Sequence, residues 1–205
     1  VFSVNDTTGS AIITISVAAG TNYTAPANKT CTVTASFKPT ASTTATSGVT
    51  YTRFVRKGIV KVYEDGSEFP IGKGVVLHES DKDVATIITS GIMVDEALKA
   101  YEQLQAEGIA VRVVDMFTWK PLDEELVVKC AAETGAIVTA ENHNVTCGLG
   151  SAVANCLAKN RPAVQEFVGV NDQFGQVGPQ AFLMDEYGLR AANIVAAVKR
   201  AIARK

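Results

Sequence analysis

The feature that most constrains the fold of this chain is an alternation, from residue 51 onward, of short apolar runs with amphipathic stretches. The apolar runs have the length of strands. The stretches between them carry apolar residues three and four positions apart, which is the spacing of one helix face. Strands that alternate with helices need crossover connections, and these give a mostly parallel sheet covered by helices. We therefore predict an α/β domain over residues 51–205.

The same periodicity predicts where the elements of this domain lie. We expect five strands, at residues 71–78, 84–89, 110–115, 136–140 and 164–170. We expect helices at residues 91–108, 121–135, 151–159, 179–187 and 191–203. Right-handed crossovers place the loops that follow the later strands at one edge of the sheet, the edge where open α/β sheets bind ligands. The segments that we expect there are 90–91, 115–119, 141–150 and 171–178.

The segment from Glu141 to Gly150 is the densest polar cluster of the domain. Glu141 and His143 lie two positions apart at a strand end, where a carboxylate and an imidazole could orient a hydroxyl or move a proton. The alternatives are that they contact a neighbouring domain, line a cleft or cap the loop.

Gly148 and Gly150 open a helix after a strand, so they could hold a phosphate on backbone N–H groups. Close packing of the helix on the sheet explains them equally well. The alternative function for the domain is thus binding of a phosphorylated ligand or nucleotide at the carboxyl edge. In the loop after residue 170 we expect a turn that packs Phe174 over the core.

The first fifty residues differ in kind, since their only charged residues are Asp6, Lys29 and Lys38. Two β-branched runs, at 11–17 and 30–37, alternate with period two and predict a pair of antiparallel strands. We describe residues 1–39 as a β-rich leader. Residues 40–50, rich in Thr and Ser and without an apolar period, form a predicted linker.

Composition excludes several classes of function. The 19 basic and 21 acidic residues give a net charge of -2, so there is no basic field for nucleic acid. No apolar run is long enough for a membrane-spanning helix. The four cysteines show no C-x2-C spacing, which disfavours a metal site, and Cys130 and Cys156 fall within helical patterns as free thiols. These features favour a reducing, cytoplasmic location.

Several ordered motifs resemble the C-terminal domain of transketolase, preceded by the last residues of its pyrimidine-binding domain. The motifs are Tyr51-Thr52-Arg53-Phe54-Val55-Arg56, Phe69-Pro70-Ile71-Gly72-Lys73-Gly74, Thr139-Ala140-Glu141-Asn142-His143, Gly148-Leu149-Gly150-Ser151-Ala152-Val153, Phe174-Gly175 and Glu186-Tyr187-Gly188-Leu189. The resemblance implies a three-layer α/β/α fold with a five-stranded, mostly parallel sheet whose first strand is antiparallel. Residues 1–37 resemble the last strands of a bacterial immunoglobulin-like module.

The resemblance also implies an activity for the parent enzyme: transfer of a two-carbon ketol unit between sugar phosphates, dependent on thiamine diphosphate and a divalent metal. The diphosphate-binding and pyrimidine-binding domains, the expected partners in a homo-oligomeric parent, carry that chemistry. We expect this chain alone to bind neither cofactor nor metal and to be inactive, serving subunit packing and the substrate channel. Arg53 matches the family arginine that contacts the substrate phosphate, and Glu141 and His143 match a loop on the interdomain side.

Overall fold

The computed structural model describes residues 11–14, 30–33, 51–53 and 60–205. The chain divides into two units, Val1–Ser42 and Thr43–Lys205. In the first unit, β1 (Ala11–Thr14) pairs antiparallel with β2 (Thr30–Val33). This confirms the predicted pairing over those residues. The rest of the leader and the linker 40–50 lie outside the described residues, so the predicted boundaries at 39 and 50 stay predictions.

The second unit contains a five-stranded mixed sheet in the order β3-β5-β4-β6-β7. Its strands are β3 (Val75–His78), β4 (Ala85–Thr89), β5 (Val111–Asp115), β6 (Ala136–Asn144) and β7 (Val164–Val170). The edge strand β3 runs antiparallel to β5, and the other neighbours are parallel. The predicted fold class, including the antiparallel first strand, is therefore confirmed.

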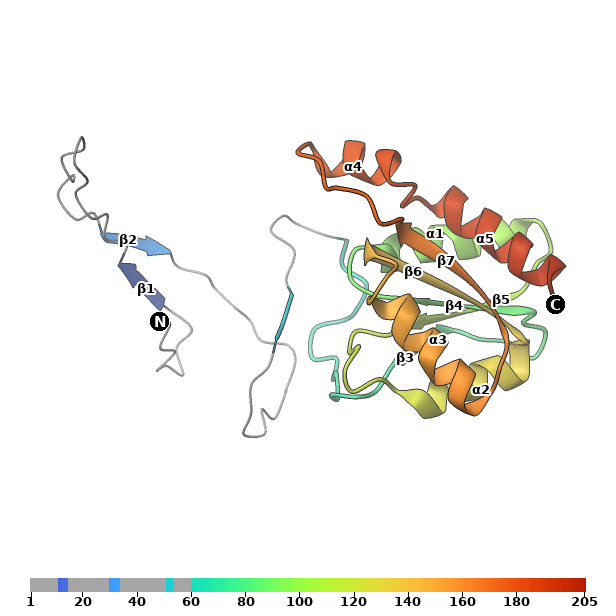
Figure 1. Ribbon diagram of the computed structural model, residues 1–205. Coiled ribbons are helices and arrows are strands. Elements are labelled where there is room, and N and C mark those ends of the chain that lie inside the picture. Colours follow the sequence, from blue (N-terminus) through green and yellow to red (C-terminus); the bar gives the residue numbers. More distant parts are fainter. Residues whose placement is uncertain (1–10, 15–29, 34–50, 54–59) are drawn as a thin grey trace. The chain divides into compact units, whose positions relative to one another are not determined.

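Helices cover both faces of this sheet and make three layers. They are α1 (Met93–Ala106), α2 (Glu124–Thr134), α3 (Leu149–Asn160), α4 (Gln180–Glu186) and α5 (Ala191–Ala203). Figure 1 shows α1 and α5 on one face and α2 and α3 on the other. Figure 1 also shows the short α4 beyond the end of the sheet.

Three boundaries differ from the prediction by more than two residues. Strand β3 begins at Val75 rather than at residue 71. Helix α2 begins at Glu124 rather than at Pro121, because the Asp123 carboxylate caps it and accepts the N–H of Leu126 at 3.2 Å. Strand β6 continues through Glu141 to Asn144, past the expected end at Ala140. The polar residues from Glu141 onward end the apolar run that predicted the strand, and the pairing with β7 shifts register between Ala140 and Asn144.

Side chains of the central strands alternate between two apolar cores. One core lies under α1 and α5 and includes Ile87, Val113 and Val138. The other lies under α2 and α3 and includes Ile88 and Val114. All five side chains are fully buried, as expected for parallel strands with helices on both faces.

Among the described residues, no helix combines the length and the apolar character needed to cross a membrane.

Candidate functional site

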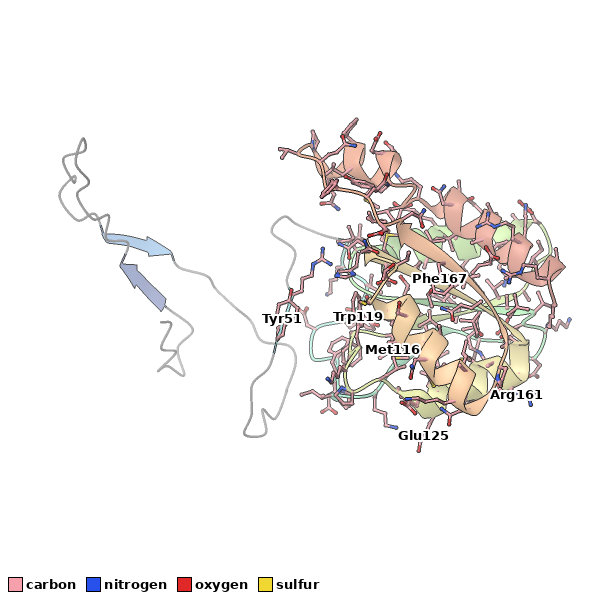
Figure 2. The ribbon with its side chains drawn as sticks, in the orientation of Figure 1. Tyr51, Met116, Trp119, Glu125, Arg161 and Phe167 are labelled. Carbon is pink, nitrogen blue, oxygen red and sulfur yellow. The ribbon has the colours of Figure 1, made fainter. Side chains whose placement is uncertain are left out.

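The carboxyl ends of β4, β5, β6 and β7 meet at one edge of the sheet, as predicted from their parallel order. Figure 2 labels Trp119, which follows β5 at this edge, and Arg161, which lies at the opposite side of the α/β unit before β7 begins. The candidate site is this carboxyl edge.

The Glu141 side chain is the central feature of the edge. It is 1% exposed. Its Oε2 accepts the N–H of Leu149 at 2.8 Å, and its Oε1 accepts the N–H of Gly150 at 2.8 Å. These two N–H groups lie in the first turn of α3, where no backbone carbonyl is available to them. Glu141 is therefore a carboxylate clamp on the start of α3.

Glycines surround the Glu141 side chain at positions where a Cβ atom would collide with neighbouring atoms. A Cβ at Gly148 would lie 1.9 Å from Glu141 Oε2, and one at Gly169 would lie 2.7 Å from a Val145 methyl and 3.2 Å from Glu141 Cγ. A Cβ at Gly150 would lie 2.6 Å from the Phe167 ring. Gly148 and Gly150 are buried, and both lie in close contact with neighbouring atoms.

This geometry shows how the residues of two sequence interpretations are bonded within the chain. The first-turn N–H groups that could have held a phosphate already bind Glu141, so the predicted phosphate site around Gly148 and Gly150 has no free donors at Leu149 and Gly150. His143 Nδ1 lies 3.9 Å from Glu141 Oε2 and 2.9 Å from the Asn144 carbonyl oxygen, so its hydrogen bond goes to Asn144. Burial raises the pKa of Glu141, against the lowering effect of the Gly150 and Leu149 N–H groups and of His143. The capping alternative is the one that the structure supports.

His143 itself is half-exposed and lies beside the Trp119 ring. The two ring centroids are 5.7 Å apart in an edge-to-face arrangement. Trp119 Nε1 donates to Ser90 Oγ at 3.0 Å, which ties the loop after β5 to the loop after β4. Because a carbonyl oxygen can only accept, Nδ1 of His143 is the donor in its hydrogen bond to Asn144.

Asp115 and Tyr63 form a second buried polar pair at this edge. Tyr63 OH donates to Asp115 Oδ2 at 2.7 Å, and Asp115 Oδ1 has no hydrogen-bond partner. Desolvation raises the pKa of Asp115 to about 6, although the hydrogen bond from Tyr63 lowers it. Sequence reasoning placed Asp115 at the edge because it ends an apolar strand, but it missed Tyr63, which lies 52 residues away and carries no local signal.

The segment before β3 is also held by aromatic contacts. Tyr63 packs edge-to-face on Phe69 at 4.7 Å, and Phe69 packs in the same way on Phe117 at 5.2 Å. This aromatic series fastens the segment to the loop after β5. Arg53 also reaches the edge, where its Nη1 donates to the Asn142 carbonyl oxygen at 3.1 Å. The structure thus brings Arg53 close to the Glu141–His143 segment.

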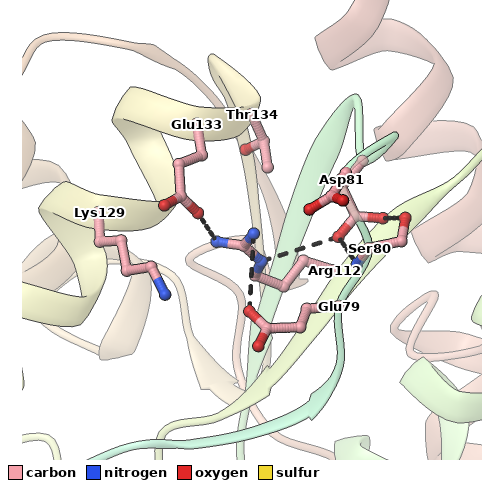
Figure 3. Close-up of a pocket in the computed structure, with 8 residues that line it drawn as sticks. Glu79, Ser80, Asp81, Arg112, Lys129, Glu133 and Thr134 are labelled. Carbon is pink, nitrogen blue, oxygen red and sulfur yellow. Dashed lines mark hydrogen bonds and ion pairs between the residues drawn. The ribbon is translucent and has the colours of Figure 1, made fainter.

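A pocket of about 800 Å³ lies elsewhere, at the amino edge between the β3–β4 loop and the end of α2. Figure 3 shows Arg112 at its centre, with ion pairs to Glu133 at 2.5 Å and to Glu79 and Asp83 at 3.7 Å. Arg112 is buried and joins β5 to α2 and to the β3–β4 loop. The pairing explains this cluster as a structural ion network, away from the carboxyl edge.

The donor set of the described residues does not fit the cofactor implied by the resemblance. No group of three or more His, Cys, Asp or Glu side chains among them could hold a metal ion. The carboxylate of Glu141 takes the N–H groups of Leu149 and Gly150.

Comparison with known proteins places this geometry in a family. The family model described as "Transketolase, C-terminal domain" matches residues 72–194. The transketolase subunit SqwH for 6-deoxy-6-sulfo-D-fructose from Clostridium sp. (strain MSTE9) is 45% identical over 161 residues, which are 78% of this chain and 49% of that protein. A putative transketolase C-terminal section from Methanocaldococcus jannaschii is 39% identical over 72% of this chain and 46% of its own length.

Solved structures agree with these relatives. The structure described as "Split gene transketolase, inactive beta4 tetramer" is 51% identical with a TM-score of 0.68, and the match covers 72% of this chain and 48% of that one. Transketolase from Leishmania mexicana, 21% identical with a TM-score of 0.50, shares the fold over 65% of this chain and 18% of its own. The match to this chain covers about half the length of the SqwH relative, and less than half the length of the other relatives. Because the family model matches residues 72–194, which are more than half of the chain, this chain belongs to the transketolase C-terminal domain family.

Proposed function

We propose that this chain is the C-terminal part of a thiamine-diphosphate-dependent transketolase that acts in the cytoplasm. Its role is to pack subunits together and to form part of the wall of the substrate channel, without catalysing ketol transfer by itself. The observation that carries this proposal is the match, at 45% identity over 161 residues, to half of a protein named as a transketolase subunit. The relatives support a thiamine-diphosphate-dependent parent enzyme.

The carboxyl edge supports a packing and channel role. Glu141 is committed to capping α3, whereas His143 and Trp119 present polar and aromatic atoms at the surface. Arg53 lies at the same edge, and a guanidinium is suited to bind a phosphate through two parallel hydrogen bonds. In this proposal Arg53 contacts the substrate phosphate in the assembled enzyme, and the Glu141–His143 segment faces the other domains.

Thiamine diphosphate titration tests the proposal directly. We expect isothermal titration calorimetry of the chain with thiamine diphosphate and Mg²⁺ to show no binding up to roughly millimolar ligand, since the described residues offer no metal-binding cluster. The positive control is the same titration after addition of a polypeptide that carries the diphosphate-binding and pyrimidine-binding domains. Binding by the chain alone with a Kd in the roughly micromolar range would contradict the proposal.

A further inference from the structure

The part of the chain that carries Arg53 and Tyr63 is bonded to the carboxyl edge at two strands. Arg53 Nη1 donates to the Asn142 carbonyl oxygen at 3.1 Å near the end of β6, and Tyr63 OH donates to Asp115 Oδ2 at 2.7 Å at the end of β5. Strand β4 lies between β5 and β6, so the two strands are roughly 10 Å apart. Both bonds therefore reach the same edge of one sheet.

The connection between the two residues does not by itself place Arg53 there. Arg53 and Tyr63 lie ten positions apart, and a connection of that length can extend to roughly 33 Å. This reach is far greater than the separation of the two strands. Arg53 is exposed, and a single hydrogen bond from an exposed side chain contributes little by itself. The position of Arg53 therefore depends on a further anchor nearby in the chain.

Tyr63 has the properties of that anchor. Its acceptor, Asp115, is 5% exposed and ends β5, a strand that pairs with β3 on one side and β4 on the other. Among the described residues Asp115 Oδ1 has no hydrogen-bond partner, so the carboxyl group bonds through Oδ2 to Tyr63. The Tyr63 ring also packs edge-to-face on Phe69 at 4.7 Å, and Phe69 packs likewise on Phe117 at 5.2 Å. Both the ring and the hydroxyl of Tyr63 are thus held at the edge.

An anchor at Tyr63 affects Arg53 in two ways. It confines Arg53 to a small volume, which raises its effective concentration beside the Asn142 carbonyl oxygen. It also favours the orientation that this bond gives to the planar guanidinium. When Nη1 is fixed, the Nε–H and Nη2–H groups point side by side in one direction, which is the arrangement that binds two oxygens of a phosphate.

We propose that Tyr63 is a positioning residue for Arg53, because its hydroxyl, bonded to Asp115, keeps the guanidinium at the end of β6 and oriented toward a substrate phosphate. This inference rests on the phosphate contact proposed above for Arg53 and names the residue that holds this contact in place. Tyr63 acts through Arg53 and does not itself touch the phosphate.

Nitrogen-15 NMR of the Arg53 guanidinium in the full chain tests this inference, with Arg53→Lys used to assign the signal. The variant Tyr63→Phe removes the hydroxyl and keeps the ring. We expect it to speed rotation about the Arg53 Cζ–Nη1 bond by about threefold or more, because the loosened Arg53 leaves the Asn142 carbonyl more often. Asp115→Asn keeps an acceptor for the Tyr63 hydroxyl and should retain the slow rotation.

Tyr187→Phe is the matched control. It also removes a tyrosine hydroxyl that donates a hydrogen bond, but the acceptor is the Phe174 carbonyl oxygen in the loop between β7 and α4. This variant should leave the rotation rate of Arg53 unchanged. Equal rates in the wild type and Tyr63→Phe, or an equal increase in Tyr187→Phe, would overturn the inference.

Activity gives a second measurement, made on this chain assembled with a polypeptide that carries the diphosphate-binding and pyrimidine-binding domains. We expect Tyr63→Phe to raise KM for a phosphorylated substrate by about threefold or more with kcat unchanged, since it weakens binding and not chemistry. A wild-type KM in Tyr63→Phe would contradict the positioning role. The NMR measurement uses no cofactor or substrate. An inactive wild-type assembly would therefore refute the proposed function, whereas the rotation rates still decide the role of Tyr63.

Discussion

At the scale of single residues, Glu141 is the side chain on which the carboxyl edge most depends. Replacing it with alanine leaves the N–H groups of Leu149 and Gly150 buried without an acceptor. Because each buried unsatisfied donor is costly, we expect Glu141→Ala to lower the free energy of unfolding by about 2–4 kcal/mol. Urea unfolding followed by circular dichroism measures this change.

Two further variants make the Glu141 experiment specific. Glu141→Gln keeps one acceptor oxygen and removes a buried charge, so we expect it to cost less than Glu141→Ala. Glu102→Ala on the exposed face of α1 is the control and should change stability by less than about 0.5 kcal/mol. If Glu141→Ala unfolds at the same urea concentration as Glu102→Ala, Glu141 does not clamp α3.

Asp115 makes the stability of the domain depend on pH. Its pKa is about 6 in the folded chain and about 3.9 in an unfolded one, so between these values the folded state binds more protons. Stability contributed by this group is therefore complete below about pH 4 and is lost as the pH rises to about 6, by roughly 2–3 kcal/mol. The physical reason is that burial penalises the charged carboxylate.

Asp115→Asn isolates that effect, because asparagine does not titrate and its carbonyl can still accept the Tyr63 hydroxyl. We expect the wild type to lose about 2–3 kcal/mol more than Asp115→Asn between pH 4 and pH 7. Urea unfolding of both proteins at each pH gives the difference, in which the other titrating groups cancel. Parallel pH profiles for the two proteins would show that Asp115 is not the titrating group.

At the scale of elements, carboxylate side chains of the chain itself accept hydrogen bonds at the N-termini of three helices. Helix α2 begins on Asp123, α3 begins on Glu141, and the first N–H of α5 donates to Glu96 Oε2 at 2.7 Å. Glu96 lies on α1, so the same bond that caps α5 also joins the two helices over one face of the sheet. Carboxylates compensate the partial positive charge at these helix starts, which an anionic ligand would otherwise use.

The sequence predicted the elements better than the bonds between them. Ile87 and Ile88 belong to an apolar run whose burial on both faces follows from strand geometry alone. The bond from Leu149 to Glu141 spans eight residues and depends on the register shift in β6, which no periodicity announces. Phe174 was expected over the core but is 99% exposed. Hydrophobicity alone does not say whether a side chain is buried, because many apolar side chains remain on the surface.

At the scale of the whole molecule, the unit Thr43–Lys205 should fold independently of the unit Val1–Ser42. It has its own two cores on the faces of one sheet, and residues 40–48 offer almost no apolar surface to bury. We expect limited proteolysis to cut the chain between the two units and to leave a stable α/β fragment. A chain that begins at Tyr51 should have the same free energy of unfolding as the full chain, within about 0.5 kcal/mol. A larger loss, measured by urea unfolding, would mean that the leader packs on the domain and contributes to its stability.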